Sequence, residues 1–446
     1  MEGKDGEKQL KKVRIFLGLG MILALLLSAC EGLPFNIPGF TSTTPTATLP
    51  ADGNGEVTPT PETTETAAAT PAPVTQLTIW VPPELDPDLE TEASVLFTNR
   101  LQLFSDLNDG LSINVRVKAA SGVGGLLDAL TATSAAAPDA LPDLIALSRP
   151  DLETAALKEL VFAVDGLTEI PDDADWYGFT RDMALLQGGT FGLPFAADAM
   201  VLVYRPASIP EFPGSWSGLF ETESVLAFAA ESDQAIFPLA LYESAGGSVQ
   251  DNQRRPMLAV DPLTEVFRLF EDGVQTGTFP DWLTQYQTTG QVWTAFREGQ
   301  TSLAVIYLSD FLQELPADSS IAPLFPVSES AVSLGTGMSW AVSTPDENRQ
   351  PFAVELAEFL VEPEYLGEWT AAAGYIPSRP SSLDAWQDQS LRTIVSQVAL
   401  MTRLRPSNDI VSSLGPILRE STRQILLDLV DPAQAAQVAV ESLEGQ

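Results

Sequence analysis

From Gln76 onward, short apolar runs of strand length alternate with amphipathic segments of helix length, and this alternation most constrains the fold. Residues 76–81 form an apolar run closed by two prolines, which predicts a buried strand that meets a loop. Helical spacing over 95–107 and strand alternation over 113–117 follow, then a helix near 126–130 and a strand at 144–147. This order with short connections predicts a parallel sheet covered by helices.

The same alternation of strand and helix patterns continues through the rest of the chain. A helix is expected over 151–160, where Ser148 or Asp151 could cap its first turn. The last hundred residues have a mainly helical pattern. Further elements are expected as a turn at 187–192, a buried strand at 199–204, helices near 236, 266–270 and 292–297, the last ending at Gly299, and a strand at 302–307.

Composition excludes several classes of site. The chain has no histidine, so it cannot form a Ser-His-Asp or Cys-His catalytic site, a histidine metal site or a histidine pH switch. Its one cysteine, Cys30, leaves no pair for a disulfide, and stability must come from an ordinary core, which a hydrophobic content of 45% can supply. We expect no cofactor and no metal.

The chain is strongly acidic. Its 60 acidic residues against 23 basic ones give a formal charge of −37, which repels nucleic acid and anionic lipid surfaces. Nucleic acid is therefore not an expected partner, and an anionic ligand would find few cations. A well-solvated external surface is favoured over an acidic ligand trap.

The first 30 residues have the features of an export signal: a basic start, an apolar run and small residues before Cys30. The segment 27–30, Leu-Ser-Ala-Cys, resembles the lipobox of bacterial lipoproteins. That resemblance implies a signal peptide over 1–29 and a lipid thioether on Cys30. The alternative is a plain transmembrane anchor. Residues 30–76, rich in Thr and Pro, predict a disordered tether after the lipidated cysteine.

Five stretches together resemble family 1 of the extracellular solute-binding proteins. None is specific alone, but their order and spacing cover about residues 77–446. They are 192–204 (GLPFAADAMVLVY), 296–305 (FREGQTSLAV), 335–342 (GTGMSWAV), 357–360 (AEFL) with Trp369, and 374–379 (GYIPSR).

The resemblance implies an α/β, two-lobed, periplasmic-binding-protein-like fold. Each lobe would be a mainly parallel sheet with flanking helices, and a ligand cleft would lie between the lobes. The expected first lobe is 77–196 plus 333–376, and the expected second lobe is 197–332 plus 377–446. The resemblance also implies a monomeric, non-enzymatic receptor outside the cytoplasm, held by the lipid at Cys30, that closes around a solute and delivers it to the permease of an ABC importer.

Several residues are candidate ligand contacts. Asp198 lies on a predicted crossing segment, and its carboxylate could accept hydrogen bonds from sugar hydroxyls or could cap a turn. Trp80 and Trp340 could stack on a pyranose or belong to the core. The remaining candidates, each with a surface or capping role as the alternative, are Ser121 in a glycine-rich turn, Asp233, Tyr242, Tyr307, Ser309 and Asp310.

The expected ligand is a carbohydrate, a mono- or oligosaccharide, because the chain has few cations and several aromatics. A receptor for polyamines or other cationic solutes on the same fold would use acidic and aromatic residues as well. A lipid-anchored glycoside hydrolase needs only two carboxylates and stays open as an alternative of another class. A receptor that signals without feeding a transporter also stays open.

Overall fold

The computed structural model describes residues 73–445. The predicted signal peptide, Cys30 and nearly all of the predicted tether lie outside the described residues. Among residues 73–445, none of the helices combines the length and the apolar content that crossing a bilayer requires.

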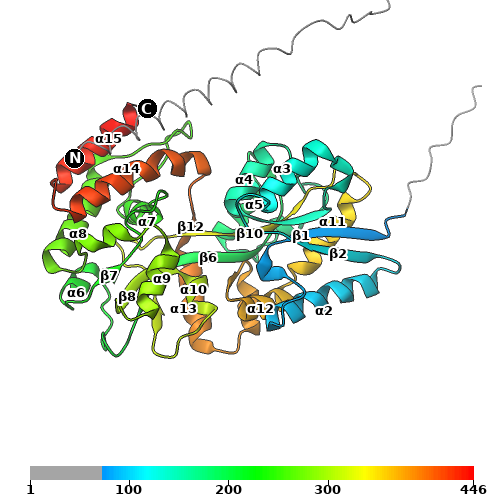
Figure 1. Ribbon diagram of the computed structural model, residues 1–446, viewed down its shortest axis with the longest axis horizontal. Helices are drawn as coiled ribbons and strands as arrows, with labels where there is room; N and C mark the ends of the chain where they lie inside the picture. Colours follow the sequence, from blue (N-terminus) through cyan, green and yellow to red (C-terminus); the bar gives the residue numbers. More distant parts are fainter. Residues whose placement is uncertain (1–72, 446) are drawn as a thin grey trace, which may run out of the picture. The chain divides into compact units, whose positions relative to one another are not determined.

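One mixed sheet runs through the described part of the chain (Figure 1). Its strand order is β2-β1-β3-β10-β6-β8-β7. The pairs β1–β2, β1–β3 and β7–β8 are parallel, whereas β10 pairs antiparallel with β3 and β6, and β6 pairs antiparallel with β8. The strands of this path are β1 Gln76–Val81, β2 Ser112–Val117, β3 Leu144–Ser148, β6 Leu193–Tyr204, β7 Leu226–Ala227, β8 Leu303–Tyr307 and β10 Ser333–Val342.

The long strands β6 and β10 join two lobes. The first half of β6 pairs with β10, from Leu193 to Ala199, and its second half pairs with β8, from Met200 to Tyr204. Figure 1 shows β6 and β10 crossing the middle of the structure between two groups of helices. Shorter strands extend this region: β9 Ser320–Ala322 and β11 Ile376–Pro377 pair with β6, and β12 Thr402–Leu404 pairs with β10.

The first lobe is built on β1, β2 and β3. Its core is aromatic: Trp340 stacks on Phe195 with ring centroids 4.6 Å apart, and Phe97 stacks on the same indole at 6.1 Å. Burial of such large rings is the main source of stability in a chain without disulfides. The helices of this lobe are α2 Glu92–Leu107, α3 Leu126–Ala136, α4 Arg149–Leu157, α11 Gln350–Leu360 and α12 Pro363–Ala373.

The second lobe is built on β7 and β8 with the second half of β6. Phe228, Phe270 and Phe279 pack around one another with centroids 5.6–5.7 Å apart. Helices α5 Gly178–Ala184 and α13 Gln389–Met401 pack near the crossing strands. The helices of this lobe are α6 Trp216–Phe220, α7 Ile236–Ser244, α8 Val260–Thr276, α9 Thr289–Arg297, α10 Leu308–Leu312, α14 Asn408–Leu426 and α15 Pro432–Glu444.

The α/β fold class and most of the expected elements are confirmed, with two differences. The helix expected over 151–160 begins at Arg149, because Ser148 caps its first turn by accepting from the Asp151 backbone N–H at 3.3 Å. It ends at Leu157. The strand expected at 199–204 begins six residues earlier, since β6 crosses between the lobes. The same crossing makes the sheet mixed: β6 and β10 pair antiparallel with each other, β10 also with β3 in the first lobe, and β6 also with β8 in the second.

Candidate ligand-binding site

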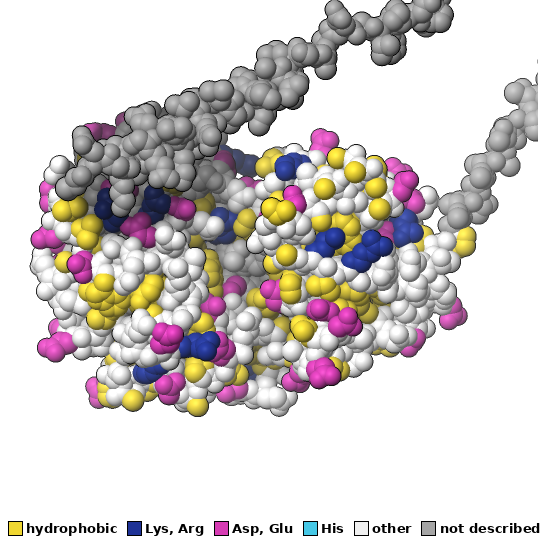
Figure 2. All heavy atoms as spheres, in the orientation of Figure 1, with side chains coloured by type: hydrophobic (Ala, Val, Ile, Leu, Met, Phe, Trp, Pro, Cys, Tyr) yellow, Lys and Arg dark blue, Asp and Glu magenta, His cyan; other side chains and the backbone are white. Residues whose placement is uncertain are grey.

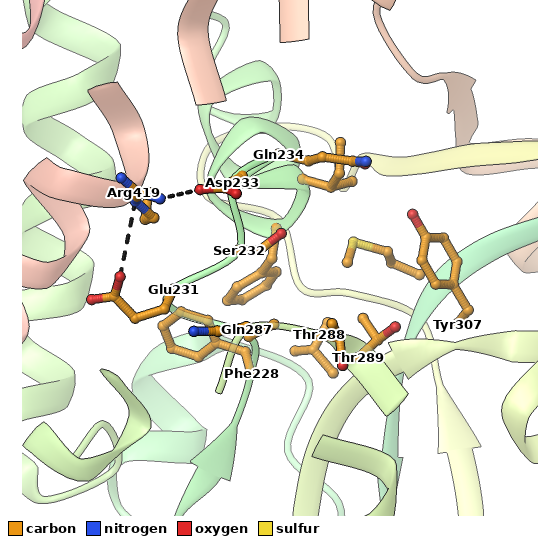
Figure 3. Close-up of a pocket in the computed structure, with 15 residues that line it drawn as sticks. Phe228, Glu231, Ser232, Asp233, Gln234, Gln287, Thr288, Thr289, Tyr307 and Arg419 are labelled. Atoms are coloured by element: carbon orange, nitrogen blue, oxygen red, sulfur yellow. Dashed lines mark hydrogen bonds and ion pairs between the residues drawn. The ribbon is translucent and has the colours of Figure 1, made fainter. Parts of the chain in front are cut away.

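A pocket of 530 Å³ opens in the second lobe (Figure 3). Its size falls within the range of small-molecule sites, about 300–1,000 Å³. Its floor is apolar and its rim is polar. The lining residues are Met200, Phe228, Ala229, Glu231, Ser232, Asp233, Gln234, Ile236, Phe237, Gln287, Thr288, Thr289, Val305, Tyr307 and Arg419.

The polar rim is held by the starts of two helices. The segment 231–235 leads into α7, and Ala235 turns the chain there in the left-handed region, at φ 46°. The backbone N–H of Glu231 donates to the Tyr286 carbonyl at 2.9 Å, which ties this segment to the opposite rim. On that rim, a capping box between Thr288 and Gln291 fixes the first turn of α9. Both segments therefore present side chains from ordered backbone.

Charge in the pocket is concentrated at one end. Arg419 of α14 pairs with Asp233, and its Nε lies 3.9 Å from the Glu231 carboxylate. Figure 3 shows these three side chains on one side and Tyr307 on the other, with Thr288 and Thr289 between them. The hydroxyl and amide groups along the rest of the rim are uncharged donors and acceptors.

A close backbone contact fixes this charged end. A Cβ on Gly415 of α14 would lie 2.2 Å from the Asp233 carbonyl oxygen and 3.1 Å from the Gln234 Cα. We expect Gly415→Ala to push the 231–235 segment away from α14 and to lower the free energy of unfolding by about 1–3 kcal/mol. The higher helix propensity of alanine offsets about 1 kcal/mol of that loss. Chemical denaturation measures the change.

Ser412→Ala is the matched control for Gly415→Ala. Ser412 is an exposed position of the same helix, so alanine there makes no new contact with the pocket rim. If Gly415→Ala were as stable as Ser412→Ala, the close approach of α14 to the pocket rim would not constrain the segment.

A second polar group lies where β6 changes partner. Asp198 is buried, and its Oδ1 accepts from the backbone N–H groups of Ala199 at 2.9 Å and Ser309 at 3.0 Å. Its Oδ2 is bonded to the Ser309 hydroxyl. Burial raises the pKa of Asp198 to about 7, although these hydrogen bonds oppose the shift. The carboxyl therefore holds the crossing strand to the start of α10.

Tyr307 connects this group with the pocket. It ends β8, faces the pocket, and is followed directly by α10. Burial, together with the nearby Asp198 carboxyl, raises the pKa of Tyr307 to about 12. Its hydroxyl therefore keeps its proton at neutral pH and can both donate to a ligand and accept from it.

The structure gathers part of the predicted set of ligand contacts. Asp233 and Tyr307 both line the pocket. Asp198 and Ser309 are bonded to each other beside Tyr307, and Asp310 lies in the first turn of α10, where burial raises its pKa. Ligand contact by these five residues stays a prediction.

The other four predicted contacts lie elsewhere. Trp340 is 2% exposed within the first-lobe core, and Tyr242 is fully buried, with its hydroxyl bonded to the Ser248 carbonyl and the Ala259 N–H. Trp80 is 2% exposed and lies under Lys118, whose Nζ is 4.2 Å from the ring centroid. Ser121 is exposed at the turn before α3. None of the four lines the pocket.

Several pocket residues were not predicted. Of the segment 231–234, only Asp233 was predicted as a ligand contact. The whole loop lies between a strand and a helix, which is a common place for ligand contacts in α/β folds. Thr288 and Gln291 form a capping-box pattern, which marks a helix start beside Thr289. Arg419 gave no such signal, because it lies in the middle of a helix almost 190 residues beyond the loop that it pairs with.

The pocket is suited to binding. Apolar and aromatic walls with hydroxyl and amide groups at the rim match a ligand with both polar edges and apolar faces. Within residues 73–445, no three His, Cys, Asp or Glu side chains are grouped so that they could hold a metal ion.

Comparisons with known proteins agree with this arrangement. The sequence profile of the bacterial extracellular solute-binding proteins matches residues 102–393. No curated protein matches the sequence significantly.

Solved structures of solute receptors share the fold. The cyclic α-maltosyl-1,6-maltose binding protein of Arthrobacter globiformis has a TM-score of 0.69 at 16% identity, over 84% of this chain and 99% of that one. The GacH receptor of Streptomyces glaucescens, solved unliganded and with acarbose, has a TM-score of 0.63 at 15% identity, over 84% and 98%. UgpB of Mycobacterium tuberculosis, solved with glycerophosphocholine, has a TM-score of 0.61 at 17% identity, over 84% and 98%.

Proposed function

Because this chain belongs to the bacterial extracellular solute-binding proteins, we propose that it is a carbohydrate receptor of an ABC importer. In this proposal the pocket at the start of α7 is the ligand site of the second lobe, and the first lobe closes over it by bending at β6 and β10. The ligand is captured and released without chemical change. A lipid on Cys30 holds the receptor outside the cytoplasm, and a permease receives the solute.

The composition of the pocket is the observation that carries this proposal. The half-buried Tyr307 ring supplies aromatic surface, and Ser232, Gln287 and Thr288 supply hydroxyl and amide groups around it. A saccharide has the same two kinds of surface, since its ring faces are apolar and its edge carries hydroxyls. Two of the structures that share this fold belong to saccharide receptors: GacH was solved with acarbose, and the Arthrobacter globiformis protein is a cyclic α-maltosyl-1,6-maltose binding protein.

The surface charge is consistent with a small ligand rather than a large polyanion. Figure 2 shows acidic side chains scattered over both lobes of the face in view, with Lys and Arg in a few small groups. Such a surface keeps the protein soluble and repels nucleic acid.

Calorimetric titration of the purified full chain with maltooligosaccharides tests the proposal. We expect saturable binding without hydrolysis of the sugar. In the variant Ser232→Trp, the indole would fill part of the pocket, so affinity should fall by at least about tenfold, which corresponds to about 1.4 kcal/mol.

Ser442→Trp is the matched control, because Ser442 is exposed on α15 and is not among the residues that line the pocket. Binding of spermidine but not of sugars would support a receptor function and show that the ligand is a cationic solute instead of a carbohydrate. Cleavage of the sugar would contradict the receptor function and indicate a glycoside hydrolase.

A further inference from the structure

The two lobes touch at a second place, where helices α4 and α14 begin. Asn408, the first residue of α14, donates its backbone N–H to Glu153 Oε1 at 3.0 Å. Its side-chain amide donates to the Pro150 carbonyl of α4 at 2.8 Å. The first turns of a first-lobe helix and a second-lobe helix are therefore joined by hydrogen bonds at the edge of the crossing strands.

Two arginines lie inside this contact. Arg149, the first residue of α4, is 6% exposed, and Arg405, three residues before α14, is 7% exposed. Arg149 Nη1 lies 3.1 Å from Glu153 Oε2, and Arg405 Nη1 donates to Asn408 Oδ1 at 3.1 Å. We call Arg149 and Arg405 the interlobe arginine pair.

The interlobe arginine pair carries two positive charges but has only one carboxylate partner among residues 73–445. Within residues 73–445, Glu153 is the only carboxylate that forms an ion pair with either guanidinium. Burial lowers the pKa of both Arg149 and Arg405, but a guanidinium stays charged at neutral pH. Two buried positive charges therefore face one buried carboxylate, and an unmatched buried charge is unfavourable.

The hydrogen-bonding groups of the pair are also incompletely used. The Nε of Arg149 is buried and has no hydrogen-bond partner among the described residues. A guanidinium has five donors in a planar fork, a geometry that matches the two oxygens of a carboxylate or phosphate. Arg149 thus has donor capacity that its own chain does not use.

The pair lies beside the proposed ligand site. The backbone N–H of Arg405 donates to the carbonyl of Gly335, which is paired with Ala199 on the crossing strands. Tyr307 faces the pocket, and the positive charge of Arg405 acts on its hydroxyl. The Asp198 carboxyl does not pair with either arginine, because its oxygens accept from Ala199 and Ser309.

We propose that the ligand carries an anionic group, a carboxylate or a phosphate, and that the interlobe arginine pair binds this group between the lobes. The inference rests on the proposed carbohydrate function and narrows it to acidic saccharides, such as those with uronate units. Because the two arginines come from different sides of the lobe contact, an anion held by both would also favour the closed state.

Calorimetric titration of the full chain with three probes tests the inference: tri-galacturonate, its neutral methyl ester and glycerol 3-phosphate. We expect the acid to bind at least about tenfold more tightly than the ester, because only the acid supplies the missing charge. In Arg405→Gln this preference should fall to less than about threefold, while the melting temperature of the unliganded protein rises, because an unmatched buried charge has been removed.

Arg403→Gln is the matched control. Arg403 lies two residues away, but its side chain is 55% exposed and pairs with Glu243, so its loss should leave the preference unchanged and lower the melting temperature rather than raise it, because Glu243 is left without its partner. A merely structural role of Arg405 would lower the melting temperature and leave the preference unchanged.

The outcomes separate the two proposals. Equal affinity for acid and ester, or an undiminished preference in Arg405→Gln, would overturn the anion site and leave the carbohydrate receptor standing. Binding of glycerol 3-phosphate that depends on Arg405, with no response to either saccharide, would support the anion site and overturn the carbohydrate function. If none of the three probes bound, the result would contradict both the anion site and the carbohydrate function.

Discussion

Trp340→Ala is expected to lower the free energy of unfolding by about 3–5 kcal/mol, the usual cost of removing a large buried aromatic side chain. The indole is 2% exposed and lies between Phe195 and Phe97 in the first-lobe core. Alanine would leave a cavity that these rings cannot fill, because both belong to elements fixed by the sheet and by α2. Chemical denaturation followed by far-UV circular dichroism measures the loss.

Trp340→Phe is the control for the same position. A phenyl ring keeps most of the stacking with Phe195 and leaves a smaller cavity, so the loss should be well under that of alanine. The contrary result is a Trp340→Ala protein of unchanged stability that no longer binds ligand. It would mean that the tryptophan contacts the ligand, as the sequence alone allowed.

The orientation of the Trp340 side chain could not be predicted from the sequence. The sequence left two roles open for Trp340, stacking on a pyranose or packing in the core. It could not decide which face of the strand meets the cleft, because β10 is covered on both sides and gives no polar alternation. The indole points to the packed side, where it meets Phe195 and Phe97.

The pocket shows a different limit. Local patterns predicted the helix near Ile236 and the strand 302–307, and thereby Asp233 and Tyr307. Arg419 reaches Asp233 only because α14 returns across the second lobe. Ala235 takes a left-handed conformation that tertiary packing imposes on a residue other than glycine. Neither feature is encoded in a local spacing.

The interlobe arginine pair also depends on contacts between distant segments. In sequence, Arg149 begins a helix and Arg405 follows a short strand, and each has an ordinary surface role available. Only the meeting of α4 with α14 buries both and leaves them with one carboxylate. The low number of cations suggested a poor anion binder, whereas the fold concentrates two of them at one point.

Asp198→Asn is expected to remove a large pH dependence of stability. The folded protein keeps the Asp198 proton up to a pH of about 7, whereas the unfolded chain releases it near its ordinary pKa of 3.8. Between these values the folded state binds more protons, so the free energy of unfolding falls as the pH rises. The difference between a pKa of 3.8 and one of about 7 corresponds to about 4 kcal/mol in the free energy of unfolding, lost between about pH 4 and pH 7.

Asparagine at position 198 imitates the protonated acid. Its carbonyl oxygen can accept from the N–H groups of Ala199 and Ser309, and its amide can donate to the Ser309 hydroxyl. The variant should therefore be similar in stability to the natural protein at pH 4 and more stable at pH 8. Urea denaturation at several pH values, compared between the two proteins, cancels the contributions of all other groups.

Asp318→Asn provides a control of opposite sign. The hydrogen bond from Arg205 lowers the pKa of Asp318, so its carboxylate stabilises the fold above its ordinary pKa, and that contribution is lost as the pH falls. Parallel stability curves for the natural protein and Asp198→Asn would show that the carboxyl ionises in the folded state as readily as in the unfolded chain. Diverging curves would mean that the joint between β6 and α10 is held by a neutral acid, and that raising the pH loosens the segment about which the lobes must bend.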